Sequence, residues 1–189
     1  TDYVFDGTQS RPYTEEDPTR PLNHYGRSKL AGEQAVLAHA SACWVLRTAW
    51  LYSLRANDFV QRVLHWSRQQ ETLRIVADQI GSPTWARLLS QMIALALAQA
   101  KGDYFNFVQQ TRGIYHLAGD GCASRLDWVK KILELDPQRS EQKTTTVLPA
   151  ETAEFPTPAQ RPLYTALDCG KFARVFGLRL PAWDQALAL

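Results

Sequence analysis

The sequence has few cysteines, no long apolar run and almost no net charge. Its three cysteines are far apart and include no CxxC pair, which argues against a disulfide framework or a metal site and favours the reducing cytoplasm. No signal peptide is visible, and the most apolar stretch, residues 88–100, is too short to cross a bilayer and is predicted to be a buried helix. A charge of +2 without basic runs favours a small-molecule partner over nucleic acid or a membrane surface.

Glycine-rich turns are also missing. None of the ten glycines falls in a GxGxxG or GxxGxxG pattern, the turn that places a dinucleotide pyrophosphate at a helix N-terminus. The chain opens at Thr1, and its one methionine is Met92. These features lead us to expect a piece of a longer protein.

What the sequence does contain is an alternation of apolar runs and helical patterns. Strands are predicted at 2–5, 43–52, 72–77, 113–119 and 145–149, and helices at 23–40, 57–70, 85–100 and 124–135. Asn23 and Ser124 are the predicted N-caps of the first and last of these helices. Strands separated by helices of about ten residues or more imply a parallel sheet with helices on both faces, so the predicted class is α/β.

Tyr25 and Lys29 lie four residues apart in the first predicted helix. Residues i and i+4 share one face of a helix, so the phenol and the ammonium can point into one cleft. A nearby cation favours the ionised form of a phenol, which suits proton transfer to or from a carbinol oxygen. Chance alone gives roughly 0.2 such pairs in a chain of this composition, so the surrounding segments must decide its meaning.

Those segments carry a resemblance to a known family. They are "TDYVFDG", "PLNHYGRSKLAGE", "RTAWLY", "VADQIGSPTWARLL", "GIYHLAG" and "FPTPAQRPLYTALDCGKF". Together they resemble the extended short-chain dehydrogenase/reductase family and, within it, the reductases of dTDP-4-dehydrorhamnose, over nearly the whole chain. The resemblance implies the C-terminal part of a Rossmann-like parallel sheet interleaved with a small α/β substrate-binding domain. The first would comprise residues 1–54 and 84–119, and the second 55–83 and 120–189.

The resemblance also implies a reaction and a cofactor. A full-length parent would use NADPH, or NADH, to reduce dTDP-4-dehydro-6-deoxy-L-mannose to dTDP-L-rhamnose, with the dTDP-sugar as its partner. The resemblance allows a homodimer, and it points to no metal ligand. Because the glycine-rich turn is missing, we expect the present chain alone to be inactive.

Catalytic roles follow from the resemblance at three positions. Tyr25 corresponds to the catalytic acid, and Lys29 to the residue that binds the nicotinamide ribose and promotes ionisation of the tyrosine. Thr1 corresponds to the hydroxyl that hydrogen-bonds the substrate carbonyl. Trp50 corresponds to a tryptophan near the sugar ring, although an apolar residue at a strand end also suits a core.

Binding roles near the nucleotide sugar are implied for Asn57, Gln79 and Arg161, and a guanidinium there could pair with the diphosphate. The alternative for each is an ordinary solvated position on the surface. On the first predicted helix, three polar residues are expected to face solvent or to cap it: Arg27, Ser28 and Glu33.

Two other functions stay open. The regulatory β subunit of methionine adenosyltransferase resembles the same reductases and would make the chain a binding module, although "RTAWLY" and "DQIGSPT" look more like the bacterial enzyme. A nucleotide-sugar dehydratase or epimerase is a third reading. Dehydratases need aspartate and then glutamate after the threonine, whereas here Asp2 is followed by Tyr3.

Overall fold

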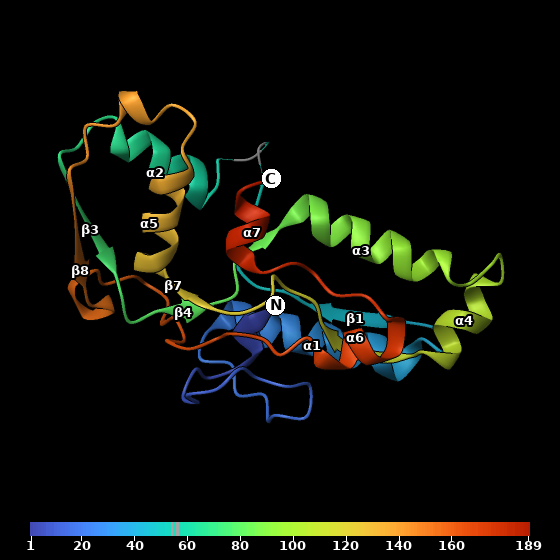
Figure 1. Ribbon diagram of the computed structural model, residues 1–189. Helices are drawn as coiled ribbons and strands as arrows, with labels where there is room; N and C mark the ends of the chain where they lie inside the picture. Colours follow the sequence, from blue (N-terminus) through green and yellow to red (C-terminus); the bar gives the residue numbers. More distant parts are fainter. Residues whose placement is uncertain (54, 56) are drawn as a thin grey trace.

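The computed structural model describes residues 1–53, 55 and 57–189 (Figure 1). The helices are η1 (Asp2–Val4), α1 (His24–His39), α2 (Phe59–Ser67), α3 (Ala86–Ala98), α4 (Tyr104–Gln110), α5 (Arg125–Leu135), η2 (Arg139–Glu141), η3 (Thr152–Glu154), α6 (Gly170–Phe176) and α7 (Trp183–Leu187). The strands are β1 (Trp44–Arg47), β2 (Leu51–Tyr52), β3 (Thr72–Val76), β4 (Ile80–Gly81), β5 (Thr84–Trp85), β6 (Gly113–His116), β7 (Ala123–Ser124) and β8 (Thr146–Ala150). The predicted α/β class is confirmed.

The strands pair two by two. β1 runs parallel to β6, β2 to β5 and β3 to β8, whereas β4 and β7 are antiparallel. Parallel pairing was predicted, and it joins strands that are distant in the sequence because each needs a helical crossover. The two longest ladders, β1–β6 and β3–β8, each form the centre of one body of the molecule.

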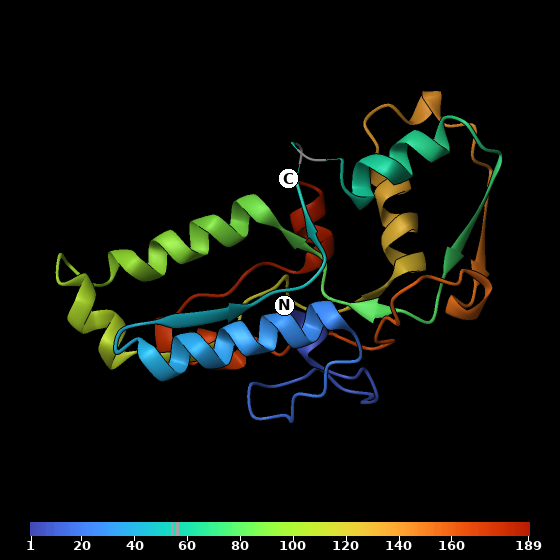
Figure 2. The same cartoon turned by 180° about the vertical axis from the view of Figure 1, so that it is seen from behind.

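The first body is built around β1 and β6. α1 contacts β1 and α6 contacts β6, and the two helices lie on opposite sides of the pair (Figures 1 and 2). Tyr115 and Leu117 pack there with Phe172 and Phe176 of α6 and with one stripe of α3. α6 therefore packs with a strand of residues 84–119, although it lies in the range assigned by sequence to the second domain. The domain division stays a prediction, and its boundary residue 54 lies outside the described residues.

The second body consists of the β3–β8 pair covered by α2 and α5 (Figure 1). Its core includes Val63, Leu73 and Trp128, all almost fully buried. Short strands β4 and β7 connect this body to the first. Within the described residues, no helix is both long and apolar enough to cross a membrane.

Three predicted elements differ from the structure. Residues 2–5 are not the end of a strand: Phe5 N–H donates to the Asp2 carbonyl at 3.1 Å, which closes the 3-10 turn of η1. The strand predicted over 43–52 is broken between β1 and β2, where Trp50 takes a left-handed φ of 43° that no regular strand accepts. Residues 88–100 are not a buried helix, because α3 packs by one stripe only and leaves Leu95 49% exposed.

Candidate active site

The first turn of α1 rests directly on η1. Asn23 is the predicted N-cap, and its Oδ1 accepts a hydrogen bond from the Gly26 N–H at 2.8 Å. A Cβ added at Gly26 would lie 2.2 Å from the Tyr3 carbonyl oxygen, so only glycine permits this approach. Cap and close contact together fix where the side chains of the first turn of α1 project.

Tyr25 and Lys29 project from the first two turns of α1 into solvent. Lys29 Nζ lies 5.6 Å from the centroid of the Tyr25 ring, and Tyr25 is 51% exposed. The ring meets Tyr3 edge to face, with centroids 5.8 Å apart. The structure thus brings the predicted pair together on an accessible face of α1.

Thr1 lies at the start of η1, beside the buried Asp2. Its hydroxyl donates to Asp2 Oδ1 at 3.1 Å and accepts from the Tyr3 N–H at 3.3 Å. Burial raises the pKa of the Asp2 carboxyl, and hydrogen bonds from Thr165 and Thr1 oppose that rise. The predicted role of Thr1 toward a substrate carbonyl stays a prediction, since its hydroxyl is engaged with neighbours.

A pocket of about 300 Å³ opens between α2, α5, β3 and the segment after η3. We call it the arginine pocket because four arginines line it: Arg62, Arg74, Arg125 and Arg161. Phe59, Trp66 and Phe155 contribute aromatic surface to the same lining. Arg74 forms an ion pair with Glu154, whereas no ion pair to Arg125 or Arg161 is found among the described residues.

Arg125 is the deepest cation of the arginine pocket. Its Cζ lies 3.7 Å from the Trp50 ring centroid, 4.8 Å from that of Phe59 and 5.5 Å from that of Trp128. Burial lowers the pKa of its guanidinium to about 10. A cation taken out of water without an acidic partner is costly, and an anionic ligand would offset that cost.

Sequence reasoning missed Arg125. Its one local signal is its place directly after Ser124, which caps α5 with Asp127 in a reciprocal capping box. That signal marks a helix start. Trp128 lies on the same helix, three residues after Arg125, whereas Trp50 and Phe59 come from other segments of the chain. The enclosure of Arg125 by all three rings is therefore visible only in three dimensions.

Trp50 contacts the core and Arg125 of the arginine pocket. Its indole stacks on Trp128 with centroids 5.5 Å apart and an interplanar angle of 20°. Gly81 leaves room for it, since a Cβ there would lie 2.4 Å from the indole Cε2. The left-handed backbone of Trp50 is thus held by packing, and both predicted roles, at the sugar and in the core, stay open.

Of the other predicted binding residues, the structure places two in the lining of the arginine pocket and one outside it. Gln79 is buried, lines the arginine pocket and donates from Nε2 to Thr152 Oγ1 at 3.1 Å. Arg161 is exposed and lines the same pocket. Asn57 is exposed, precedes the α2 N-cap and lies outside the described lining.

Tyr3 contacts Tyr25 and lies within electrostatic range of two arginines of the arginine pocket. It touches the Tyr25 ring, and the cations of Arg161 and Arg125 act on its phenol. Burial raises the pKa of Tyr3, with a further rise from the Asp2 charge, and the two arginines oppose that rise.

Glu33 corrects a prediction made from the sequence. It does not face solvent or cap α1, because both of its oxygens accept hydrogen bonds from Arg47 of β1, the shortest at 2.7 Å. Both side chains are buried. This charge-assisted pair attaches the Tyr25 helix to the first ladder.

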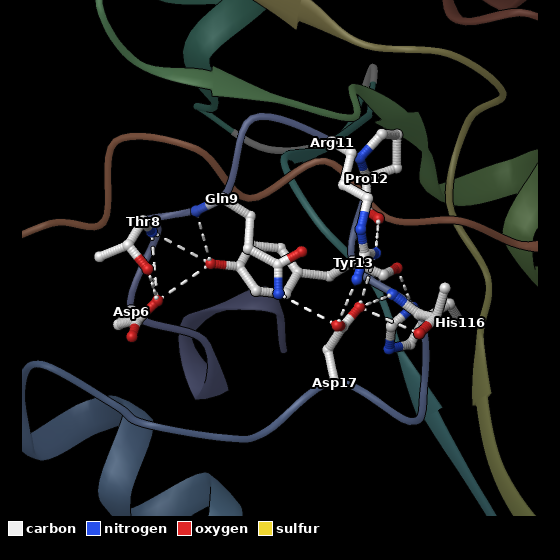
Figure 3. A network of polar contacts seen from close by, with 9 residues as sticks. Asp6, Thr8, Gln9, Arg11, Pro12, Tyr13, Asp17 and His116 are labelled. Carbon is white, nitrogen blue, oxygen red and sulfur yellow. Dashed lines mark hydrogen bonds and ion pairs between the residues drawn. The ribbon is translucent and has the colours of Figure 1, made fainter.

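The loop between η1 and α1 is held by its own polar network (Figure 3). Asp17 accepts hydrogen bonds from Arg11, Gln9 and Thr14, and the Arg11 guanidinium beside it holds the pKa of that carboxyl well below its usual range. Tyr13 donates from its hydroxyl to Asp6 at 3.0 Å. The network orders the path from Thr1 to Tyr25.

Metal ions and nicotinamide cofactors require different side chains from these residues. No group of three or more metal-ligating side chains occurs in the part of the chain that the structure describes. A nicotinamide cofactor fits the exposed face of α1, where the Lys29 ammonium has no ion-pair partner among the described residues and Tyr25 stands beside it. These two residues could hold the ribose end of such a cofactor.

The fold, together with the Tyr25–Lys29 pair on α1, is that of a protein of the short-chain dehydrogenase/reductase type. The family model described as the RmlD substrate binding domain matches residues 1–189. The chain belongs to this family.

Named relatives agree with that assignment. The dTDP-4-dehydrorhamnose reductase of Sinorhizobium fredii is 39% identical over 186 residues, which are 98% of this chain and 62% of that protein. The dTDP-4-dehydrorhamnose reductase of Burkholderia thailandensis is 38% identical over 192 residues, covering 100% and 64%. The chain thus spans less than two thirds of these relatives.

Solved structures are similar over the same extent. A dTDP-4-dehydrorhamnose reductase from Clostridium acetobutylicum superposes with a TM-score of 0.83 at 31% identity, covering 99% of this chain and 61% of that one. The enzyme from Bacillus anthracis, solved in complex with NADP, gives 0.81 at 34% identity, with 98% and 61% covered. A UDP-N-acetylglucosamine 4-epimerase from Bacillus cereus, at 15% identity and a TM-score of 0.69, shares the fold alone.

Proposed function

We propose that this chain is the substrate-binding part of an NADPH-dependent reductase that converts dTDP-4-dehydrorhamnose to dTDP-L-rhamnose. The observation that carries the proposal is the exposed Tyr25–Lys29 pair of α1, in contact with Tyr3, whose phenol feels the charges of two arginines of the arginine pocket. The names of the relatives and the NADP complex of the Bacillus anthracis enzyme support it. The site of action would be the cytoplasm, and a homodimer stays a prediction.

The reaction needs a hydride and a proton. The nicotinamide, when bound, supplies the hydride to C4 of the sugar. The Tyr25 hydroxyl donates its proton to the C4 oxygen, so that the carbonyl becomes an alcohol and the tyrosine is left as phenolate. The Lys29 ammonium stabilises that phenolate and binds the ribose. The Thr1 hydroxyl, which donates to Asp2 in the structure, would turn from Asp2 to donate a hydrogen bond to the same carbonyl.

The arginine pocket would hold the nucleotide end of the substrate. Arg125 and Arg161 have no acidic partner among the described residues, and a guanidinium pairs with phosphate oxygens in a bidentate fashion. Phe59 and Trp66 supply flat apolar surface for the base or sugar. Gln79 adds a polar contact at the pocket wall.

The test is Tyr25→Phe in the full-length protein. This change removes the proton donor and keeps the ring, so turnover of dTDP-4-dehydrorhamnose should fall by roughly 10² to 10⁴. Tyr104→Phe, at an exposed tyrosine of α4, is the matched control and should keep full turnover. Near wild-type turnover of Tyr25→Phe would reject the proposal, and capture of methionine adenosyltransferase by the protein would favour the regulatory alternative.

A further inference from the structure

Asn23 is buried and uses both atoms of its side-chain amide. Its Oδ1 caps α1, and its Nδ2 donates to the Gln160 carbonyl oxygen at 2.9 Å. The orientation of the amide is fixed by its partners, because the Gly26 N–H can only donate and the Gln160 carbonyl can only accept. A cap requires the acceptor alone, since serine and aspartate serve equally well there. The Nδ2 contact is therefore an addition, made across 137 positions of the chain.

Gln160 belongs to a segment that carries one wall of the arginine pocket. Arg161, the next residue, lines that pocket. Farther along, the Leu163 carbonyl accepts a hydrogen bond from the Ile80 N–H at 2.7 Å. Gly7, with a φ of 76°, fits closely beneath, since a Cβ there would lie 2.7 Å from the Leu163 nitrogen. The backbone around Arg161 is thus held on both sides, by Asn23 before it and by Leu163 after it.

Asn23 also stands two residues before Tyr25. One amide side chain therefore joins the backbone that carries the proton donor to the backbone that carries a pocket cation. A reaction that needs a carbonyl beside Tyr25 and a diphosphate beside Arg161 depends on the spacing of these two points, because small misplacements of a bound reactant are costly to rate.

We propose that Asn23 is a positioning residue that holds Arg161 of the arginine pocket in register with Tyr25. The inference rests on the proposed function, since it assumes that one substrate contacts both residues. It assigns to Asn23 a role in substrate affinity that is separate from its role as a helix cap.

The experiment compares Asn23→Ser with the wild type in the full-length protein. Serine keeps the cap, adds no charge and is too short to reach the Gln160 carbonyl. The KM for dTDP-4-dehydrorhamnose should rise by about 3- to 10-fold, as expected for a lost hydrogen bond. The kcat should stay within about 2-fold, because Tyr25 keeps its place on a capped helix. Asp103→Ser, an equivalent exchange at the N-cap of α4, should change neither constant.

A double-mutant cycle gives the decisive readout. If Asn23 acts through Arg161, Asn23→Ser should raise KM no further in an Arg161→Gln background. Additive effects, or an unchanged KM in Asn23→Ser, would overturn the inference. Asn23→Asp, which keeps both the cap and the shape of the side chain, provides a second variant should serine reduce expression, and it should raise KM likewise.

Failure of this inference differs from failure of the proposed function. If Tyr25→Phe is inactive and the cycle is additive, the reductase assignment stands and the positioning role falls. If the wild type neither reduces the sugar nucleotide nor binds dTDP-L-rhamnose in calorimetry, both fall together.

Discussion

Trp50 contacts both a buried core residue and a cation of the arginine pocket. It stacks on the buried Trp128, and the Arg125 guanidinium lies over its ring at 3.7 Å. A cation held over an indole gains roughly 1 to 2 kcal/mol where water is excluded. Removing the indole should therefore release Arg125 from its orientation in the pocket as well as open space beside Trp128.

We predict that Trp50→Ala in the full-length protein raises the KM for the sugar nucleotide more than it affects folding. The alanine leaves Arg125 with one stacking partner fewer, so its fork meets the diphosphate less often in the right orientation. A purely structural role would instead cost about 3 to 5 kcal/mol of stability. Steady-state kinetics and thermal unfolding of the same preparation decide: a large drop in melting temperature with unchanged KM would assign Trp50 to the core.

His116 is a buried residue whose protonation should lower the stability of the fold. It lies on β6 opposite Arg47, and its Nδ1 is 2.9 Å from the Tyr13 carbonyl oxygen (Figure 3). Burial, together with the Arg47 cation, lowers its pKa to about 4. An unfolded chain has an ordinary histidine pKa of about 6.5 and so binds a proton first as the pH falls.

The free energy of unfolding should therefore decrease as the pH falls from about 6.5 to 4, with a contribution from His116 of about 3 kcal/mol at most. Urea unfolding at pH 7, 6 and 5 measures it. His116→Gln should flatten the slope in this window, whereas His39→Gln, at an exposed histidine of α1, should leave the slope as it is. An equal slope in His116→Gln and the wild type would contradict the assignment.

At the scale of elements, the two glycines of α1 face different surroundings. Gly26 packs on the Tyr3 carbonyl, whereas nothing lies within 4 Å of a Cβ added at Gly32. Gly26→Ala should push the first turn off η1 and cost about 1 to 3 kcal/mol, with a loss of turnover because Tyr25 moves with it. Gly32→Ala should stabilise the protein by up to about 1 kcal/mol, because alanine is the better helix former.

Denaturant unfolding of the two single variants, alongside turnover in the full-length protein, tests this contrast. Equal stability changes for the two alanine variants would mean that the stability of α1 does not depend on the close contact between Gly26 and the Tyr3 carbonyl. A stable Gly26→Ala variant with full activity would show that the first turn can shift without consequence for the reaction.

Local features of these elements could be predicted from the sequence. The caps Asn23 and Ser124 were predicted because capping depends on a few neighbouring residues, and both are confirmed. The proximity of Tyr25 and Lys29 follows in the same way from the helical repeat. The break in the strand at Trp50 was not predictable, because its left-handed backbone is stabilised by Trp128 and Gly81 from elsewhere in the chain.

Contacts between segments that are distant in the sequence could not be predicted from it. Glu33 looks like a solvent-facing residue of a helix until Arg47 is seen beside it. Arg125 looks like the first residue of an amphipathic helix, and only Trp128 of its aromatic neighbours lies on that helix, because Trp50 comes from the break between β1 and β2 and Phe59 from α2. The resemblance to a known family supplied positions such as Gln79 and Arg161, yet it did not indicate which cation is the most deeply placed.

At the scale of the whole molecule, the described residues form the arginine pocket from α2, β3, α5 and the segment that ends at Arg161. All of its lining residues lie between Phe59 and Arg161, and the cores of both bodies are formed by the described residues. In contrast, this sequence contains no glycine-rich turn to anchor a cofactor pyrophosphate, because none of the ten glycines is placed in a dinucleotide-binding pattern. We therefore expect this chain to bind the substrate without catalysing hydride transfer.

We predict that the isolated 189-residue chain binds dTDP-L-rhamnose but does not oxidise NADPH. Without a pyrophosphate anchor the nicotinamide is not oriented, and positioning of reactants can account for roughly 7 to 11 kcal/mol of a barrier. Calorimetry of the sugar nucleotide should show affinity that Arg125→Gln weakens by about 10- to 100-fold, since charge-assisted hydrogen bonds are lost. Arg87→Gln, at an exposed arginine outside the pocket lining, should bind as the wild type does. Measurable NADPH oxidation by the isolated chain would show that Lys29 and its neighbours suffice to orient the cofactor.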